Sequence, residues 1–223
     1  MNPQAAESEL RLPPEFAGSF LSSVHLLARL GEGKRSTAYR VLWQGRECAL
    51  KVYNPAAVTK HSQRHPLALA RFEYRRNLAL YRAPGLAAHV AKPLAYLVAG
   101  SAQAFVQEFI PGALFEHFRV DADPVQVASL VASLPGLIRG AHAVGIYDLD
   151  LHPNNVMVTD DGKGGVDFKL FDFNKIPFNE RSPNPLSWLL LRLGLIRPAS
   201  RDLRRLHLFT DPPGRNRLGT RRQ

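Results

Sequence analysis

The most constraining feature of this chain is a polar loop, an apolar run and a second polar turn that lie between residues 150 and 174. In order, they read Asp150-Leu151-His152-Pro153-Asn154-Asn155, Val156-Met157-Val158 and Phe171-Asp172-Phe173-Asn174. A glycine-rich turn at 160–165 separates two apolar runs, Val156–Thr159 and Phe168–Phe171, which predicts a β-hairpin between the polar segments. Each polar segment alone could be an ordinary turn or helix cap. Together they place a carboxylate five positions before an amide and a second carboxylate after a short hairpin. This arrangement indicates a functional site.

The composition is that of an ordinary globular protein. The chain has 223 residues, of which 45% are apolar and 22% charged, so it can form one domain of two lobes or two small domains. Cys48 is the only cysteine, which excludes an internal disulfide and indicates either a reducing compartment or a protein that is indifferent to redox conditions. The first residues lack the basic and apolar regions of a signal peptide, and no apolar run reaches the ~20 residues of a spanning helix. We therefore expect a cytoplasmic protein.

The pattern of apolar residues divides the chain into a β-rich half and a helical half. Residues 1–18 read as a leader, 19–210 as the folded domain and 211–223 as a basic tail. The expected strands are Val24–Leu30, Thr37–Trp43, Glu47–Tyr53, Lys92–Val98 and Ala104–Phe109, and the expected helices are Leu67–Arg82 and 123 to about 144. An α+β fold follows, with five strands and one helix over about 19–110 and a mainly helical part over about 111–210.

A second group of candidate residues lies in the β-rich half. Gly31 and Gly33 flank a turn between two strands, where glycine lets backbone N–H groups approach phosphate oxygens. Lys51 lies in an apolar strand, and lysine is rarely buried without an anionic partner. Glu73, on the helix that follows, is the expected partner. The alternatives are a plain tight turn, an exposed strand lysine and a solvent-facing glutamate.

These motifs resemble the protein kinase-like superfamily over roughly Val24 to Lys175. The resemblance implies a bilobal fold that binds ATP and Mg²⁺. It implies that Asp150 is the catalytic base, that Asn155 and Asp172 hold the metal, and that Lys51 with Glu73 positions the phosphates. The residues expected to contact the nucleotide are Gly31, Gly33, Ala38, Ala49, Lys51, Glu108 and Ile110, the last pair through the hinge-like segment 106–112. His152, two residues after the base, is expected to have a structural role.

The chain departs from the usual pattern at four points. Ser36 stands in place of a third glycine, Asp148 in place of the histidine two residues before the base, and Asn174 in place of the glycine after Asp172-Phe173. Because asparagine tolerates φ > 0, the turn at Asn174 can survive. No Ala-Pro-Glu motif follows Asp172, and only about fifty residues remain, which disfavours a protein substrate docked on a full helical lobe. These departures keep open an alternative, a regulatory pseudokinase that binds nucleotide without transferring phosphate.

A narrower resemblance concerns the acceptor. The forms DLHPNN and FDFNK are similar to those of small bacterial kinases of lipopolysaccharide-core sugars (Kdo and heptose kinases), and of compact kinase-like proteins of the PhoP regulatory network. This resemblance implies transfer of the γ-phosphoryl group to a hydroxyl of a small molecule or of an envelope glycolipid sugar.

The C-terminal part carries most of the net charge of +10. Residues 181–223 hold ten arginines against Asp202 and Asp211. The apolar segment 185–197 is either a core helix or an interfacial helix on an anionic membrane, where neighbouring arginines (Arg192, Arg197, Arg201, Arg204 and Arg205) would meet lipid and make the protein peripheral on the inner membrane. No nucleic-acid-binding signature accompanies these arginines, so we expect no specific nucleic acid partner.

Overall fold

The computed structural model describes residues 18–162, 165–177, 189–190, 193, 195 and 199–211. Among them, the chain divides into two units. The first takes the residues up to Tyr74 together with Pro93–Phe109, and the second takes Arg75–Lys92 together with the residues from Ile110 onward.

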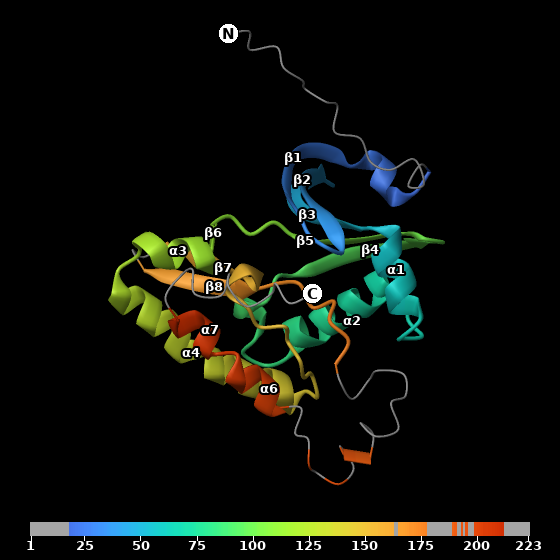
Figure 1. The fold of residues 1–223 in the computed structure, drawn as a ribbon. Helices are drawn as coiled ribbons and strands as arrows, with labels where there is room; N and C mark the ends of the chain where they lie inside the picture. Colours follow the sequence, from blue (N-terminus) through green and yellow to red (C-terminus); the bar gives the residue numbers. More distant parts are fainter. Residues whose placement is uncertain are drawn as a thin grey trace, which may run out of the picture. The chain divides into compact units, whose positions relative to one another are not determined.

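The first unit is built on a five-stranded antiparallel sheet with the order β1-β2-β3-β5-β4 (Figure 1). Its strands are β1 (His25–Glu32), β2 (Ser36–Trp43), β3 (Arg46–Tyr53), β4 (Pro93–Ala99) and β5 (Ala102–Glu108). All five expected strands are present, with bounds shifted by at most two residues. Gln44 and Gly45 join β2 to β3 with φ angles of 51° and 71°, the geometry of a two-residue hairpin turn that the Gln-Gly pair predicts.

Two helices follow β3. Helix α1 (Pro55–Ser62) was not expected, although Asn54-Pro55 is a start signal: the Asn54 side chain accepts a hydrogen bond from the Ala57 N–H at 2.8 Å. Helix α2 (Leu69–Arg82) begins two residues later than predicted and is shared between the units.

Alternation along β3 assigns its side chains to different faces of the sheet. Cys48 and Leu50 are buried in one apolar cluster, with Leu21, Val41, Ala104 and Val106. Tyr53 lies in a second cluster with Val58, Leu69, Ala70 and Phe105. Lys51 therefore points to the face opposite to Leu50, toward the side that Tyr53 occupies.

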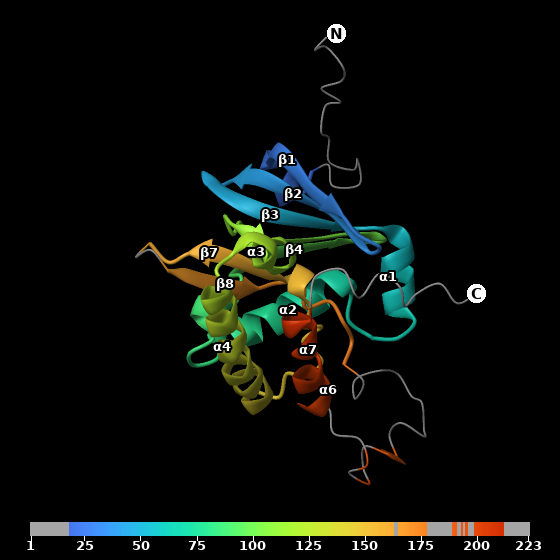
Figure 2. The same ribbon diagram turned by 60° about the vertical axis from the view of Figure 1, so that its left-hand side comes forward.

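The second unit combines helices with a three-stranded sheet of order β6-β7-β8 (Figure 1). Its strands are β6 (Ala113–Leu114), β7 (Val156–Asp160) and β8 (Val166–Leu170), and its own helices are α3 (Phe115–Asp121), α4 (Pro124–Ala143), α6 (Ala199–Arg204) and α7 (His207–Thr210). The predicted hairpin and the predicted long helix are confirmed. Asp123 caps α4 by accepting from the Val125 N–H at 2.8 Å, and the helix continues through Pro135. Helix α6 packs beside α4 (Figures 1 and 2).

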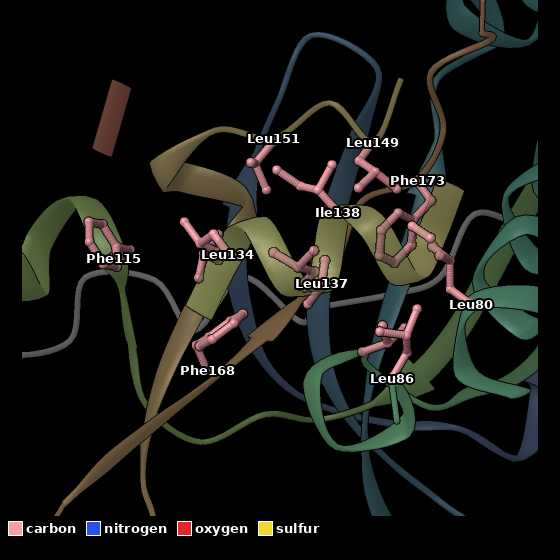
Figure 3. Close-up of a cluster of buried hydrophobic side chains, with 14 of the residues drawn as sticks. Leu80, Leu86, Phe115, Leu134, Leu137, Ile138, Leu149, Leu151, Phe168 and Phe173 are labelled. Atoms are coloured by element: carbon pink, nitrogen blue, oxygen red, sulfur yellow. The ribbon is translucent and has the colours of Figure 1, made fainter. Parts of the chain in front are cut away.

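The core of this unit surrounds α4, and the polar loop is anchored in it (Figure 3). Leu149 and Leu151, on either side of Asp150, are almost fully buried, as is Phe173 next to Asp172. Because these apolar neighbours are held in the core, the backbone positions of Asp150 and Asp172 are fixed. The alternation of apolar and polar residues therefore anchors the polar loop to the core.

No helix in the described part of the chain is long and apolar enough to cross a membrane. Most of segment 185–197 lies outside the described residues, so the choice between a core and an interfacial helix stays open.

Candidate active site

In the first unit, Lys51 and Glu73 form an ion pair. The Lys51 Nζ lies 3.0 Å from Glu73 Oε1 and 3.1 Å from Oε2. The Glu73 side chain is only 1% exposed, so its carboxylate needs compensating donors. Lys51 supplies one, and the Tyr53 hydroxyl donates another to Oε2. The structure therefore brings together the two residues that the sequence paired, while their role toward phosphate stays a prediction.

The other residues expected to contact nucleotide in this unit lie along its strands. Ala38 on β2 is paired with Gly31 on one side and with Lys51 on the other. A Cβ atom at Gly31 would meet nothing within 4 Å, and one at Gly33 would meet only the Ser36 carbonyl oxygen at 3.7 Å. The fold itself therefore does not require glycine at either position.

Of the last three expected contacts, two lie on strands of the first unit and one belongs to the second unit. Ala49 on β3 pairs with Gln107, and Glu108 ends β5, paired with Cys48. Ile110 belongs to the second unit and is buried.

In the second unit, the loop around Asp150 has an unusual backbone. Asp148 and Asp150 adopt φ angles of 55° and 56°, a region that is costly for residues other than glycine. The Asp202 carboxylate on α6 stabilises this conformation: it accepts from the N–H groups of Asp148 and Leu149, each at 2.9 Å. His142 Nε2 contacts the same carboxylate at 3.0 Å. Asp202 is fully buried, and no sequence motif predicted that it would contact this loop.

The Asp150 carboxylate has two cationic partners. Lys175 Nζ lies 2.9 Å from Oδ1, and Arg205 Nη1 lies 2.5 Å from the same oxygen. Burial opposes ionisation of Asp150, but the hydrogen bond from Arg205 and the charge of Lys175 outweigh it, so its pKa lies below the ordinary value. Burial lowers the pKa of Lys175, and Asp150 offsets this only in part. The ionised form of Asp150 is thus favoured.

Asn155 and Asp172 lie at the same end of the β7–β8 hairpin. Val156, which follows Asn155, pairs with Leu170, and the Phe171 N–H donates to the Asn155 carbonyl at 3.1 Å. The Asn155 side-chain amide donates to the Asp150 carbonyl at 2.9 Å, which connects the loop to the hairpin and leaves the amide oxygen for a cation. The structure therefore brings Asp150, Asn155 and Asp172 into one neighbourhood.

The turn after β8 differs from our expectation in detail. The residue with φ > 0 is Asp172, at 69°, and not Asn174. The Asn174 side chain instead donates to Asp172 Oδ1. Asparagine at this position therefore holds the carboxylate and does not relieve backbone strain.

His152 takes a local structural role. Its Nδ1 accepts from the Asn154 N–H at 3.2 Å, and burial lowers its pKa, although the charges of Glu116 and Asp150 act in the other direction. A neutral ring is the form that accepts this bond. The side chain thus caps the turn that leads to Asn155.

The donor atoms fit Mg²⁺, which prefers oxygen ligands and keeps positions for phosphate and water. Asn155 and Asp172 offer one amide oxygen and one carboxylate. In the described part of the chain, no group of three or more His, Cys, Asp or Glu side chains forms a metal site of its own.

Sequence reasoning missed one residue beside the Lys51–Glu73 pair, Tyr53, and three around Asp150: Lys175, Asp202 and Arg205. Lys175 directly follows the second polar turn, which is a usable signal. Tyr53 lies two residues after Lys51 on the same strand face, which is another. Asp202 and Arg205 lie more than 50 residues after the residues that they contact, and no local pattern connects them.

Comparisons with known proteins agree with the architecture. No family model and no curated protein sequence matches the chain. Among solved structures, the kinase domain of Mycobacterium tuberculosis PknI matches in a double-mutant form with a TM-score of 0.61 and 20% identity, over 86% of this chain and 77% of that one. Another crystal structure of that domain matches with a TM-score of 0.60 and 20% identity, over 86% and 74%. This chain has a protein kinase-like fold. The kinase-like fold confirms the predicted α+β class, with its five-stranded antiparallel N-terminal sheet and helical C-terminal part. At this level of identity, the likeness concerns the fold alone.

Proposed function

We propose that this protein is an ATP- and Mg²⁺-dependent phosphotransferase. The γ-phosphoryl group of ATP passes to a hydroxyl group of a small molecule or of an envelope glycolipid sugar. The observation that carries the proposal is the hydrogen-bonded neighbourhood of Asp150, Asn155 and Asp172, on a kinase-like fold. It supplies an ionised base next to oxygen donors of the type that bind magnesium.

Asp150 is the proposed base. It orients the acceptor hydroxyl and takes its proton as the acceptor oxygen bonds to the γ-phosphorus. The bond from that phosphorus to the β–γ bridging oxygen breaks, and ADP leaves with its electron pair. Asn155 and Asp172 hold Mg²⁺, which, when bound, neutralises charge on the phosphates.

The proposed nucleotide contacts belong mainly to the first unit. Lys51, oriented by Glu73, binds phosphate oxygens, and the backbone at Gly31 and Gly33 covers them. The support for this is the short Lys51–Glu73 pair and the absence of any packing need for these glycines. Adenine contacts at Ala38, Ala49, Glu108 and Ile110 rest on the resemblance to kinases.

The acceptor class rests on the DLHPNN and FDFNK forms, which resemble those of lipopolysaccharide-core kinases and PhoP-network proteins. An acceptor of that kind is membrane-bound, which would suit an arginine-rich C-terminal segment at an anionic surface. Of the arginines considered for that surface, Arg201 and Arg205 are paired with Asp148 and Asp150. The proposed membrane role therefore falls to the other arginines.

Calorimetry with Mg·ATP is the first test, on the parent and on Asp172→Asn. We expect binding by the parent and binding weakened by about tenfold or more in the variant, because a charged ligand to the metal is lost. Asp121→Asn is the matched control, since Asp121 is exposed at the end of α3. No binding by the parent at millimolar nucleotide would refute the proposal.

Transfer is tested separately, with radiolabelled ATP and a panel of lipopolysaccharide-core sugars and small alcohols. Asp150→Asn should bind Mg·ATP as the parent does and lose transfer by roughly 10²-fold or more. Binding by the parent without transfer to any acceptor, or to water, would favour the pseudokinase alternative.

A further inference from the structure

The Asp150 carboxylate is bound through one of its two oxygens. Lys175 Nζ and Arg205 Nη1 both contact Oδ1, at 2.9 Å and 2.5 Å. Among the described residues, no donor contacts Oδ2. The side chain is therefore held on one side and left open on the other.

The positions of Lys175 and Arg205 are fixed by burial and by a neighbouring helix. The Lys175 side chain is 10% exposed and follows the Asp172 turn by three residues. Arg205 directly follows α6, whose Asp202 is fully buried and binds the N–H groups of Asp148 and Leu149. Helix α6 thus binds the backbone of the loop, and the residue that follows the helix binds the side chain of its central carboxylate.

The neighbouring charges strengthen this arrangement. Asp148, whose side chain is 2% exposed, lies 3.2 Å from Arg201 Nε and 3.8 Å from Lys175 Nζ. Lys175 therefore lies between two carboxylates and cannot move toward solvent without leaving both. This distinguishes the group from a surface ion pair, which is worth little because both side chains are mobile.

We propose that Arg205 and Lys175 are positioning residues for Asp150: they hold Oδ1 so that Oδ2 faces the acceptor hydroxyl. This inference rests on the proposed function. A carboxylate that is free to rotate spends part of its time with neither oxygen in line with the acceptor, and orientation of this kind contributes strongly to rate. Two donors on one oxygen remove that freedom without occupying the reactive oxygen.

The experiment compares Arg205→Gln with Arg204→Gln, a matched change at the neighbouring exposed arginine that ends α6. Hydrolysis of Mg·ATP, with water as the acceptor, gives kcat, and calorimetry gives the nucleotide Kd. We expect Arg205→Gln to lower kcat by about tenfold and to leave Kd within about twofold, because the lost bond acts on the base and not on ATP. Arg204→Gln should change neither, and Arg205→Lys should restore much of the rate. In an Asp150→Asn background, Arg205→Gln should cause no further loss.

Three results would overturn the inference. Arg205→Gln could turn over ATP at the parental rate, or faster, which would make the contact irrelevant or inhibitory. It could instead lower kcat and nucleotide affinity together, as a general structural defect would. Lastly, the rate loss could persist in the Asp150→Asn background.

A further measurement tests the contact itself and does not need turnover. Unfolding by denaturant of Asp150→Asn, Arg205→Gln and the double variant forms a double-mutant cycle. Non-additive changes are expected, because each substitution removes the same bond. If the parent binds no Mg·ATP, the proposed function fails. Additive changes in the free energy of unfolding would instead overturn the positioning role alone.

Discussion

Substitution of Asp202 by asparagine tests how the polar loop is held. The carboxylate is fully buried and accepts three hydrogen bonds, from Asp148 N, Leu149 N and His142 Nε2. Hydrogen bonds to a charged group contribute about 1.5–3 kcal/mol each. Asparagine keeps the volume and one acceptor oxygen, which can retain the bond to Leu149. Its NH₂ group then replaces the oxygen that Asp148 and His142 contact, so we expect the free energy of unfolding to fall by about 3 kcal/mol.

Two measurements check this prediction. Denaturant unfolding gives the free-energy change, and hydrogen exchange reports the amides of Asp148 and Leu149 individually. Both amides should exchange much faster in Asp202→Asn than in the parent. Asp121→Asn, the same change at an exposed position, should alter neither quantity. Parental protection of both amides in Asp202→Asn would refute the reasoning, whatever the change in global stability.

Three further predictions concern the first unit. Lys51→Met should raise the Kd for Mg·ATP by about tenfold or more in calorimetry, because a charge-assisted bond to phosphate is lost, whereas Lys60→Met, at an exposed lysine of α1, should not. Burial, with a smaller contribution from the charge of His65, lowers the pKa of His61 to about 4. The free energy of unfolding therefore holds its full value above pH 6.5 and falls by at most about 3 kcal/mol as the pH decreases toward 4, because the buried ring must then take up a proton. Denaturant unfolding of His61→Gln should show a flatter pH dependence over this range. Burial raises the pKa of the Cys48 thiol, which is 1% exposed, so iodoacetamide should modify it, as read by mass spectrometry, only after unfolding; rapid modification of the native protein would contradict this.

Local pattern was sufficient for most of the fold. Apolar and polar residues alternate along the strands around Lys51. The Gln44-Gly45 pair between two of them is typical of a two-residue hairpin turn. Helix α4 carries its own start signal in Asp123 and Pro124. Helix α1 was not predicted, although Asn54 and Pro55 provide the same kind of start signal. Its eight residues show little apolar periodicity, which is the main sequence signal for a helix.

The surroundings of Asp150 were less accessible to such reasoning. The order of Asp150, Asn155 and Asp172 predicts that they meet, because the hairpin between them returns the chain to its starting point. The residues that hold Asp150 come from elsewhere. Arg205 and Asp202 reach the loop through tertiary packing of α6 against α4, and packing between distant segments leaves no periodic trace in one sequence.

Two features that looked unrelated in the sequence explain each other in the structure. Asp148 replaces the histidine expected before the base, and arginines concentrate after residue 180. A carboxylate as buried as that of Asp148 is very costly unless cations accompany it. Arg201 and Lys175 are those cations, and Lys175 also binds Asp150. The carboxylate at residue 148 therefore depends on Arg201 of α6, and Arg205, which directly follows that helix, contacts Asp150. We conclude that part of the positive charge near the end of the chain serves the loop itself, and that losing Arg201 should expose this dependence as a loss of stability.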